Sequence, residues 1–263
     1  MATDRAAYWN AIGRIWQTSR PQKLWRAHSD QVNTALLEQW LPAGQVERLL
    51  KTDAFDEASS PGLYPALVRR ARYVIEADVS TVMLQAARHR HGTLRAAVAD
   101  VCRLPFADST FDVIVSNSTL DHLACHAEIE LGLRELYRVL CPGGLLIVTL
   151  DNPTNPAIAL RNALPFSLLN RLGILPYQVG ATMNAKRLGH ALRQTHFDVL
   201  NEAYVMHHLP EISVQFACLL ERHASHKTQS RYLRLLMSLE RLGSWPTRTL
   251  TGYFVAMRAV KMR

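Results

Sequence analysis

Short apolar runs alternate with helix-like stretches along the middle of this 263-residue chain, and this alternation limits the fold more than any other feature. We predict strands at 48–53, 72–78, 94–100, 111–117 and 144–150, with two more near 197–206 and 250–260. Helical stretches are expected at 63–70, 80–90 and 126–140. Repeats of strand, helix and strand are typical of a parallel sheet covered by helices on both faces. The sequence therefore predicts an α/β fold with a mostly parallel, seven-stranded sheet.

The rest of the chain is expected to add helices to this sheet. Residues 1–46 have apolar side chains at helical spacing and several tryptophans, so we interpret them as a helical N-terminal arm. The arm is either a plain surface element or a cover over a ligand pocket. The sheet domain would occupy residues 47–263, with helical insertions at 151–195 and 207–247. Both insertions contain long apolar stretches, which favours a hydrophobic cover over a bound molecule.

Composition says little about partners. The chain carries 30 Lys and Arg against 22 Asp and Glu, a net charge of +8, but the basic residues are scattered. Its four cysteines form no CxxC pair, which indicates reduced thiols and no metal site. No signal peptide is recognisable, and no stretch approaches the roughly 18 apolar residues of a membrane span. We therefore expect a soluble cytoplasmic protein without an integral membrane segment.

Polar side chains stand at the carboxyl ends of the predicted strands. Asp78 ends the second strand, Asp100 the third and Asn117 the fourth. Ligands of open parallel sheets bind outside these ends. One carboxylate there can accept both hydrogen bonds of a ribose diol, and a second can accept from an exocyclic amine. The pattern therefore suits an adenosine-type ligand.

The same region resembles a known family. VIEADVSTVMLQAAR, ADVCRLPFADSTFDVIVSNSTLDHL and ELYRVLCPGGLLIVTL resemble consecutive motifs of the class I S-adenosylmethionine-dependent methyltransferases. The resemblance is close over 72–150 and extends by architecture over 48–260. It implies a Rossmann-like sheet, S-adenosyl-L-methionine as the cofactor, and methyl transfer as the activity.

The resemblance also implies roles for individual residues. It assigns to the cofactor Asp78, Val79, Met83, Asp100, Val101 and Asn117. Asp78 would bind the ribose hydroxyls, with Val79 and Met83 flanking the adenine. Asp100 and the backbone of Val101 would read the adenine edge, and Asn117 would lie beside the methionine portion. Asp78 also precedes a helix, so it can act as a helix cap at the same time.

The first loop departs from the family pattern. Lys51 stands where the family has an acidic residue, and no glycine occurs between Lys51 and Gly62. Alternating glycines normally let the backbone approach the cofactor closely. We place Thr52, Asp53 and Phe55 among the cofactor contacts. Either an acidic side chain of residues 53–57 meets the cofactor's ammonium while Lys51 or Thr52 meets its carboxylate, or the site no longer binds the cofactor.

Candidate residues for the acceptor side follow later strands. His122 and Asp121 follow the fourth strand and are the candidate catalytic bases. For His122 the plain alternative is a structural hydrogen bond to a carbonyl. Asp151 and Asn152 after the fifth strand, and His207 after the sixth, are expected to bind the acceptor. The histidines have no further ligand at metal-type spacing, so no metal is assigned.

These observations together predict methyl transfer to a small-molecule or lipid-like acceptor. A nucleic acid is disfavoured because the fourth strand is followed by NSTL and no basic stripe is visible. A basic amphipathic stretch at 228–243 leaves peripheral membrane contact open. The alternative is a non-catalytic or repurposed relative that acts as a partner subunit or binds another ligand. The acceptor, the methylated atom and the oligomeric state stay open.

Overall fold

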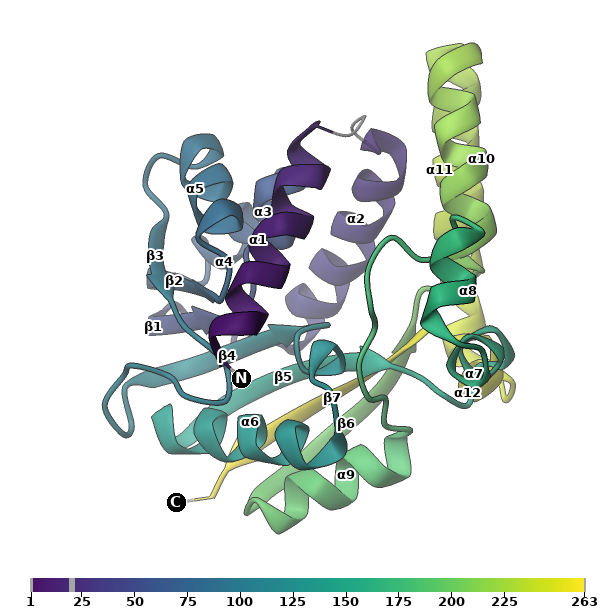
Figure 1. The fold of residues 1–263 in the computed structure, drawn as a ribbon. Coiled ribbons are helices and arrows are strands. Elements are labelled where there is room, and N and C mark those ends of the chain that lie inside the picture. Colours follow the sequence, from purple (N-terminus) through teal and green to yellow (C-terminus); the bar gives the residue numbers. More distant parts are fainter. Residues whose placement is uncertain (1, 19–21, 263) are drawn as a thin grey trace.

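A computed structural model, which describes residues 2–18 and 22–262, has one seven-stranded sheet in the order β3-β2-β1-β4-β5-β7-β6 (Figure 1). The strands are β1 Val46–Lys51, β2 Ala71–Asp78, β3 Arg95–Val98, β4 Phe111–Asn117, β5 Leu140–Asp151, β6 Phe197–Val205 and β7 Phe254–Lys261. The first five are parallel, and β7 runs antiparallel to both of its neighbours. This arrangement confirms the predicted α/β, Rossmann-like fold.

The first residues of two predicted strands, β5 and β7, differ from the prediction. β5 begins at Leu140 and not at 144, because the Pro142–Gly144 turn is absorbed into the strand, with Gly143 at φ 77°. Only glycine takes this backbone angle without strain. The last strand begins at Phe254, since the residues expected to open it form the short helix α12, Arg248–Thr251.

Helices cover both faces of the sheet. They are α1 Ala2–Thr18, α2 Lys23–Trp40, α3 Phe55–Ser59, α4 Tyr64–Leu67, α5 Thr81–Arg90, α6 His126–Val139, α7 Pro156–Ala163, α8 Phe166–Arg171, α9 Ala185–Gln194, α10 Pro210–His223 and α11 His226–Leu239, with 3₁₀ turns η1 Leu120–His122 and η2 Glu240–Ser244. Figure 1 places α6 and α9 below the sheet and α1, α2 and α5 above it. Each face has its own buried apolar cluster.

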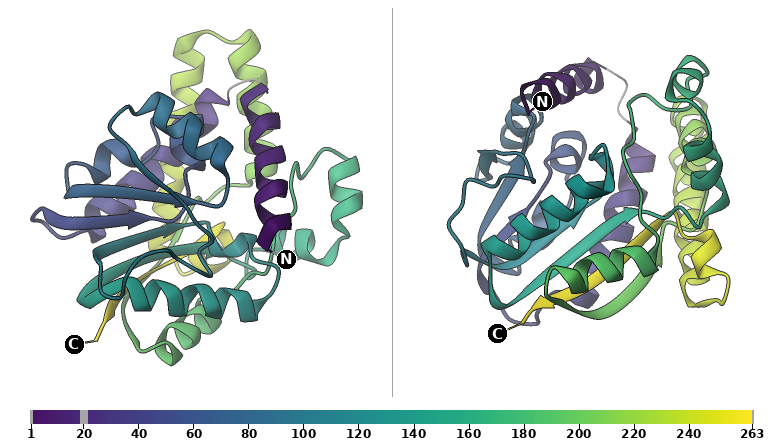
Figure 2. Two further views of the ribbon diagram at one scale, coloured as in Figure 1. Left: turned by 60° about the vertical axis from the view of Figure 1, so that its left-hand side comes forward. Right: turned by 60° about the horizontal axis from the view of Figure 1, so that its bottom comes forward.

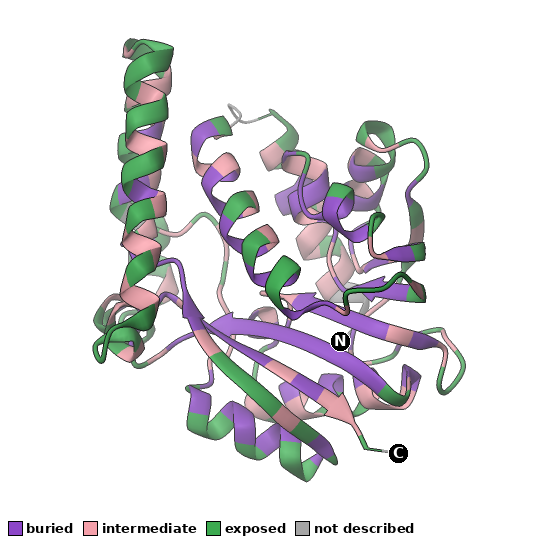
Figure 3. Cartoon of the chain, turned by 180° about the vertical axis from the view of Figure 1, so that it is seen from behind, coloured by how far each residue is buried: buried purple, intermediate pink, exposed green. Residues whose placement is uncertain are grey.

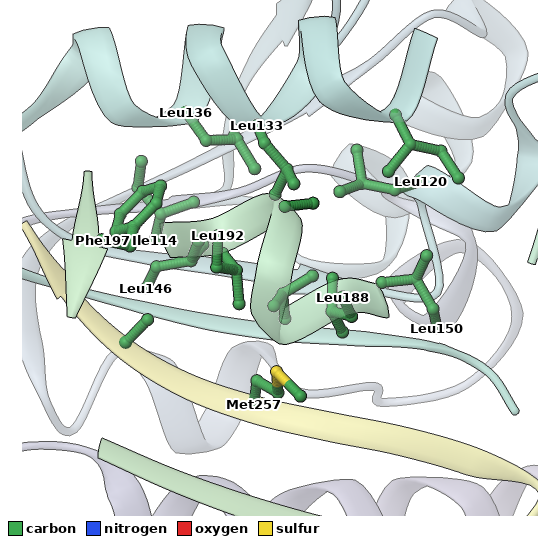
Figure 4. Packing of buried hydrophobic residues seen from close by; sticks show 14 of the residues in the cluster. Ile114, Leu120, Leu133, Leu136, Leu146, Leu150, Leu188, Leu192, Phe197 and Met257 are labelled. Atoms are coloured by element: carbon green, nitrogen blue, oxygen red, sulfur yellow. The ribbon is translucent and has the colours of Figure 1, made fainter. Parts of the chain in front are cut away.

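The lower cluster fixes α6 and α9 against the sheet. Leu133 of α6 and Leu188 of α9 are fully buried and share one apolar cluster with Phe197 of the edge strand β6 and Met257 of β7 (Figure 4). Because α9 is part of this cover, it belongs to the sheet domain. The last part of the predicted insertion at 151–195 thus forms α9, Ala185–Gln194, which covers the sheet.

The N-terminal arm packs on the upper face. Leu36, Leu37 and Trp40 of α2 are buried in the cluster above the sheet. α1 lies along α5, where the Asn10 side-chain oxygen accepts hydrogen bonds from the Ser80 hydroxyl (2.9 Å) and from the backbone N–H of Val82 (3.2 Å). These contacts bring α1 over the edge of the sheet at which β2 ends.

The second insertion forms a helical hairpin. α10 and α11 project from the body of the molecule, and both contact α2 (Figures 1 and 2). The hairpin surface is largely exposed (Figure 3), including Ile212 at 65% and Leu219 at 52% of their full areas. Among the helices of residues 2–18 and 22–262, none combines the length and apolarity needed to cross a bilayer.

Candidate functional site

A cavity of about 230 Å³ lies at the carboxyl edge of the central strands. It is lined by nine of the residues that the sequence singled out: Thr52, Asp53, Phe55, Asp78, Val79, Asp100, Val101, Asn117 and His122. These residues follow β1, β2, β3 and β4, whose carboxyl ends meet here because the strands are parallel. The structure therefore brings most of the candidate residues together.

Five other candidates do not line the cavity. Met83 is 5% exposed and packs beneath α1, where Gly13 leaves room for it. Asn152 donates to the carbonyls of Thr249 and Gly252, which ties the start of the insertion to α12 and the loop behind it. His207 Nε2 donates to the carbonyl of Tyr204 over 2.9 Å. These three side chains are committed to packing or to structural hydrogen bonds.

Asp121 and Asp151 form a buried network behind His122. Asp151 pairs with Arg161 at 2.6 Å, and Asp121 Oδ2 accepts from the backbone N–H of Asp151 at 3.1 Å. Burial raises the pKa of both carboxyls to about 6. Neither residue lines the cavity, whereas His122 does, and the charge of Asp151 acts on His122.

Asp78 occupies the end of β2 and has both oxygens engaged. Oδ1 accepts from the backbone N–H of Ser80 at 2.7 Å, and Oδ2 accepts from the backbone N–H of Ala54 at 2.9 Å. Burial raises the pKa of Asp78 to about 6, against the lowering effect of these two bonds. Ser80 is itself the N-cap of α5, with its hydroxyl accepting from the Met83 N–H. The carboxylate can thus hold the loops and face the cavity together.

Asp100 is held by the arm. Its Oδ2 lies 2.7 Å from Nη1 of Arg5 on α1, and Oδ1 accepts from the backbone N–H of Cys102 at 2.9 Å. Arg5 also pairs with Glu128 of α6 at 2.9 Å. This bridge anchors α1 across the end of β3.

The glycine-free loop turns into α3 by using side-chain acceptors. Among the described residues between 52 and 61, none has a positive φ, and the first to do so is Gly62 at 63°. Asp53 Oδ1 accepts from the Phe55 N–H at 3.1 Å, and Asp78 accepts from the Ala54 N–H. Hydrogen bonds to the Asp53 and Asp78 carboxylates therefore stabilise the turn of this loop, which has no glycine.

Lys51 is the centre of a buried charge cluster. Its Nζ lies 2.9 Å from Asp53 Oδ2, 2.9 Å from Glu57 Oε2 and 3.8 Å from Asp56 Oδ2. Desolvation works against the ammonium, but the surrounding carboxylates outweigh it and raise the pKa of Lys51 well above its usual value. Lys51 does not line the cavity, so the expectation that it meets a cofactor carboxylate finds no support in its placement. The three carboxylates also lie close enough together to hold a cation, and the Lys51 ammonium already serves them.

Glu76 of β2 is the register partner of Lys51 on β1. It is fully buried, and neither oxygen has a hydrogen-bond partner among the described residues. Burial, together with the charge of Glu57, raises the pKa of Glu76 to about 10. The side chain is therefore protonated at neutral pH.

His122 sits in an aromatic corner of the cavity. Its ring centroid lies 4.7 Å from that of Trp9 on α1 and 5.6 Å from that of Tyr177 in the first insertion. Burial lowers the pKa of His122, against the raising effect of the Asp151 charge. Nδ1 is buried without a partner in the described part of the chain. A lowered pKa favours the neutral imidazole, the form that can remove a proton.

Several cavity residues were not predicted individually. The arm contributes Arg5, Trp9, Ile12, Trp16, Trp25, Arg26, Ser29 and Asn33. The aromatic character of residues 1–46 was the available signal, and it favours the reading of the arm as a pocket cover. Ser118 and Met206 also line the cavity and have positive φ values of 50° and 59°. Such strained backbone is common around ligand sites.

Residues 58–148 match the family model described as "Methyltransferase domain". The match begins immediately after the glycine-free loop and covers the segments that form β2 to β5. It therefore includes Asp78, Asp100, Asn117 and His122.

Curated relatives match over less than half of the chain. Demethylmenaquinone methyltransferase of Streptomyces griseus is 37% identical over 81 residues, which are 31% of this chain and 34% of the relative. The ubiquinone/menaquinone biosynthesis C-methyltransferase UbiE of Citrobacter koseri is 34% identical over 118 residues, 42% of this chain and 46% of the relative. The chain thus spans less than half the length of these two relatives.

Solved structures resemble the fold over most of its length. A SAM-dependent methyltransferase from Thermotoga maritima has a TM-score of 0.59 at 15% identity, covering 90% of this chain and 91% of that chain. Geranyl diphosphate C-methyltransferase from Streptomyces coelicolor has a TM-score of 0.56 at 13% identity, covering 88% and 77%. The whole chain therefore shares the fold of these methyltransferases, and residues 58–148 are similar in sequence to a methyltransferase domain.

Proposed function

We propose that this protein transfers a methyl group from S-adenosyl-L-methionine to a small-molecule or lipid-like acceptor. The observation that carries the proposal is the cavity at the carboxyl edge of the sheet, where Asp78, Asp100 and Asn117 converge on one space. The methyltransferase names of the relatives support the same activity.

The residues present fit the cofactor. Asp78 would accept from the ribose hydroxyls, and Asp100 with the backbone of Val101 would bind the adenine edge. Asp53 lines the cavity as a carboxylate and suits the ammonium of the methionine portion. When bound, the cofactor supplies a methyl group on a positively charged sulfur, which acidic walls favour electrostatically.

The acceptor side favours a molecule with an apolar body. Trp9, Trp25, Tyr177 and Phe254 give this part of the cavity aromatic walls. Aromatic walls exclude water and align an apolar acceptor for an in-line transfer. His122 lines this corner and burial lowers its pKa, which favours the neutral imidazole, so we assign it the removal of the acceptor's proton.

One observation favours a second candidate function. Lys51 replaces the family's acidic residue, and the family match begins only after this loop. A relative that no longer binds the cofactor, and serves as a partner subunit or binds another ligand, is the alternative.

Calorimetric titration with S-adenosyl-L-methionine and S-adenosylhomocysteine separates the two. The proposal expects saturable binding of both, and folded protein that binds neither at millimolar concentration overturns it. Reduced demethylmenaquinone, geranyl diphosphate and phosphoethanolamine then serve as acceptor probes, with formation of S-adenosylhomocysteine as the readout. We expect turnover with an apolar probe and not with phosphoethanolamine.

A further inference from the structure

One face of α2 points polar side chains into the cavity. Arg26, Ser29 and Asn33 all line it, at spacings of three and four residues that place them on one side of a helix. They are 7%, 5% and 5% exposed. Buried polar side chains at a cavity need partners, because an unsatisfied polar group in such a place is costly.

Arg26 is only partly satisfied. Its Nη2 donates to Asp56 Oδ1 at 2.7 Å and to Ser29 Oγ at 3.0 Å. The Arg26 side chain makes these two hydrogen bonds and no others with the described residues. Its Nε is buried without an acceptor. The guanidinium carbon lies over the Phe55 ring, 5.1 Å from its centroid, so the ring contacts the group at the cavity wall. Arg26 therefore keeps donor capacity beyond its structural bonds.

The other cations around the cavity are already committed. Lys51 is enclosed by its carboxylates and does not line the cavity. Arg5 lines it at the end of β3 but bridges Asp100 and Glu128. The basic residues among the described cavity lining are Arg5 and Arg26. Of these two, Arg26 lies at the ends of β1 and β4 and keeps N–H donors without an acceptor.

The neighbours of Arg26 define which part of a ligand would reach it. Asp56 links Arg26 to Asn117, whose Nδ2 donates to Asp56 Oδ2 at 3.2 Å. Burial would raise the pKa of Asp56, but the charges of Arg26 and Lys51 outweigh it and hold that pKa below its usual value. Asp56 is therefore ionised, and its carboxylate positions the Arg26 guanidinium beside Asn117 and Asp53.

We infer that Arg26 binds the carboxylate of the cofactor's amino-acid portion. This inference rests on the proposed function and adds a binding residue from the N-terminal arm. Asp53 would face the ammonium and Arg26 the carboxylate of the same zwitterion. The arm would thereby take over a contact that the glycine-free loop makes difficult, since its backbone N–H groups are occupied by Asp53 and Asp78.

The test compares two ligands that differ in this portion. S-adenosylhomocysteine carries the amino acid, and 5′-methylthioadenosine lacks it. We expect Arg26→Gln to weaken S-adenosylhomocysteine binding by about 10- to 100-fold, the range of a charge-assisted hydrogen bond. Binding of 5′-methylthioadenosine should change less than about twofold. Arg26→Lys keeps a positive charge beside Asp56. We expect it to weaken binding of S-adenosylhomocysteine relative to 5′-methylthioadenosine, but less than Arg26→Gln does.

Two control variants separate this role from general damage. Arg5→Gln releases Asp100 at the adenosine end, so it should change the affinity for both ligands by the same factor. Arg69→Gln removes an exposed pair with Glu38 and should change neither. Thermal unfolding of each variant checks that it is folded.

The binding results distinguish the role of Arg26 from the proposed function. Equal weakening of both ligands by Arg26→Gln and Arg26→Lys, or no weakening, overturns the inference and leaves the proposed function intact. If Arg26→Gln does not fold, Arg26→Lys carries the comparison. Wild-type protein can also be titrated with decarboxylated S-adenosylhomocysteine, and affinity equal to that of the parent compound overturns the inference without any variant. Wild-type protein that binds none of these nucleosides overturns the proposed function itself.

Discussion

The carboxylate of Asp78 accepts a hydrogen bond of 2.9 Å from the backbone N–H of Ala54, which joins the end of β2 to the first loop. The loop has no glycine there, so a side chain supplies the acceptor that organises its backbone. The other oxygen accepts from Ser80 at the start of α5. Asp78 thus shapes the cavity wall that it also lines.

Asp78→Asn is therefore expected to weaken nucleoside binding strongly. The amide presents N–H groups where Ala54 and Ser80 already donate, so one of these bonds is lost and the ribose acceptor is weakened. We expect the affinity for S-adenosylhomocysteine to fall at least tenfold by calorimetry. Asp198→Asn, at an exposed position of β6, is the matched control and should bind like the wild type. Unchanged affinity in Asp78→Asn would remove Asp78 from the ribose site.

The same carboxyl predicts a pH dependence. Burial raises the pKa of Asp78 to about 6, and only the ionised form accepts from both ribose hydroxyls. As pH falls below about 6, a proton must leave for the ligand to bind, so affinity should fall by up to about tenfold per pH unit. Titration of 5′-methylthioadenosine between pH 5 and 8 measures this slope. A flat profile contradicts the assignment, and Asp78→Asn should lack the step.

The sequence predicted the polar edge of the sheet better than the residues that cover it. Asp78, Asp100 and Asn117 were found because a strand end fixes where its next side chain lies, and this is a local property. Arg26 lies on α2, and only long-range packing of that helix over β1 and β4 brings it to the cavity. Met83 lies outside the cavity lining because α1 covers the first turn of α5, and a family resemblance does not reveal this packing.

His122 should affect turnover more than binding. If it removes the acceptor's proton, His122→Asn should lower kcat by about 100-fold or more and leave the calorimetric affinity for S-adenosylhomocysteine within about threefold. Burial lowers the pKa of His122, so the acid limb of the wild-type kcat profile should lie below 6.5 and be absent in the variant. His190→Asn, exposed on α9, is the control. Reduced demethylmenaquinone is the first acceptor to use, and equal kcat profiles would exclude the role.

Lys51 is expected to matter chiefly for stability. Lys51→Met leaves Asp53 and Glu57 buried without their 2.9 Å partner. Removing one member of a buried charge cluster costs about 3–5 kcal/mol of unfolding free energy. Arg69→Met, which breaks an exposed pair, should cost less than about 1 kcal/mol. Urea unfolding at pH 7 compares them, and losses of equal size would contradict the view that the Lys51 cluster holds the first loop.

Glu76 gives a pH signature opposite in sign to that of an ordinary salt-bridged acid. Burial, with the charge of Glu57, raises its pKa to about 10, far above the value of 4.5 expected for an unfolded chain. Between these values the native state holds a proton that the unfolded state has lost, so unfolding free energy falls as pH rises, by up to about 1.4 kcal/mol per unit. Glu76→Gln stays neutral in both states and loses this contribution.

The variant should therefore gain stability relative to the wild type as pH increases from 6 to 9, as measured by urea unfolding at each pH. Glu130→Gln on α6, where no ion pair is recorded for this glutamate among the described residues, is the matched control for the same substitution outside the Lys51 cluster. Parallel profiles for Glu76→Gln and the wild type would mean that Glu76 is ionised in the folded protein. The Lys51 cluster would then have to accommodate one more negative charge beside Asp53 and Glu57.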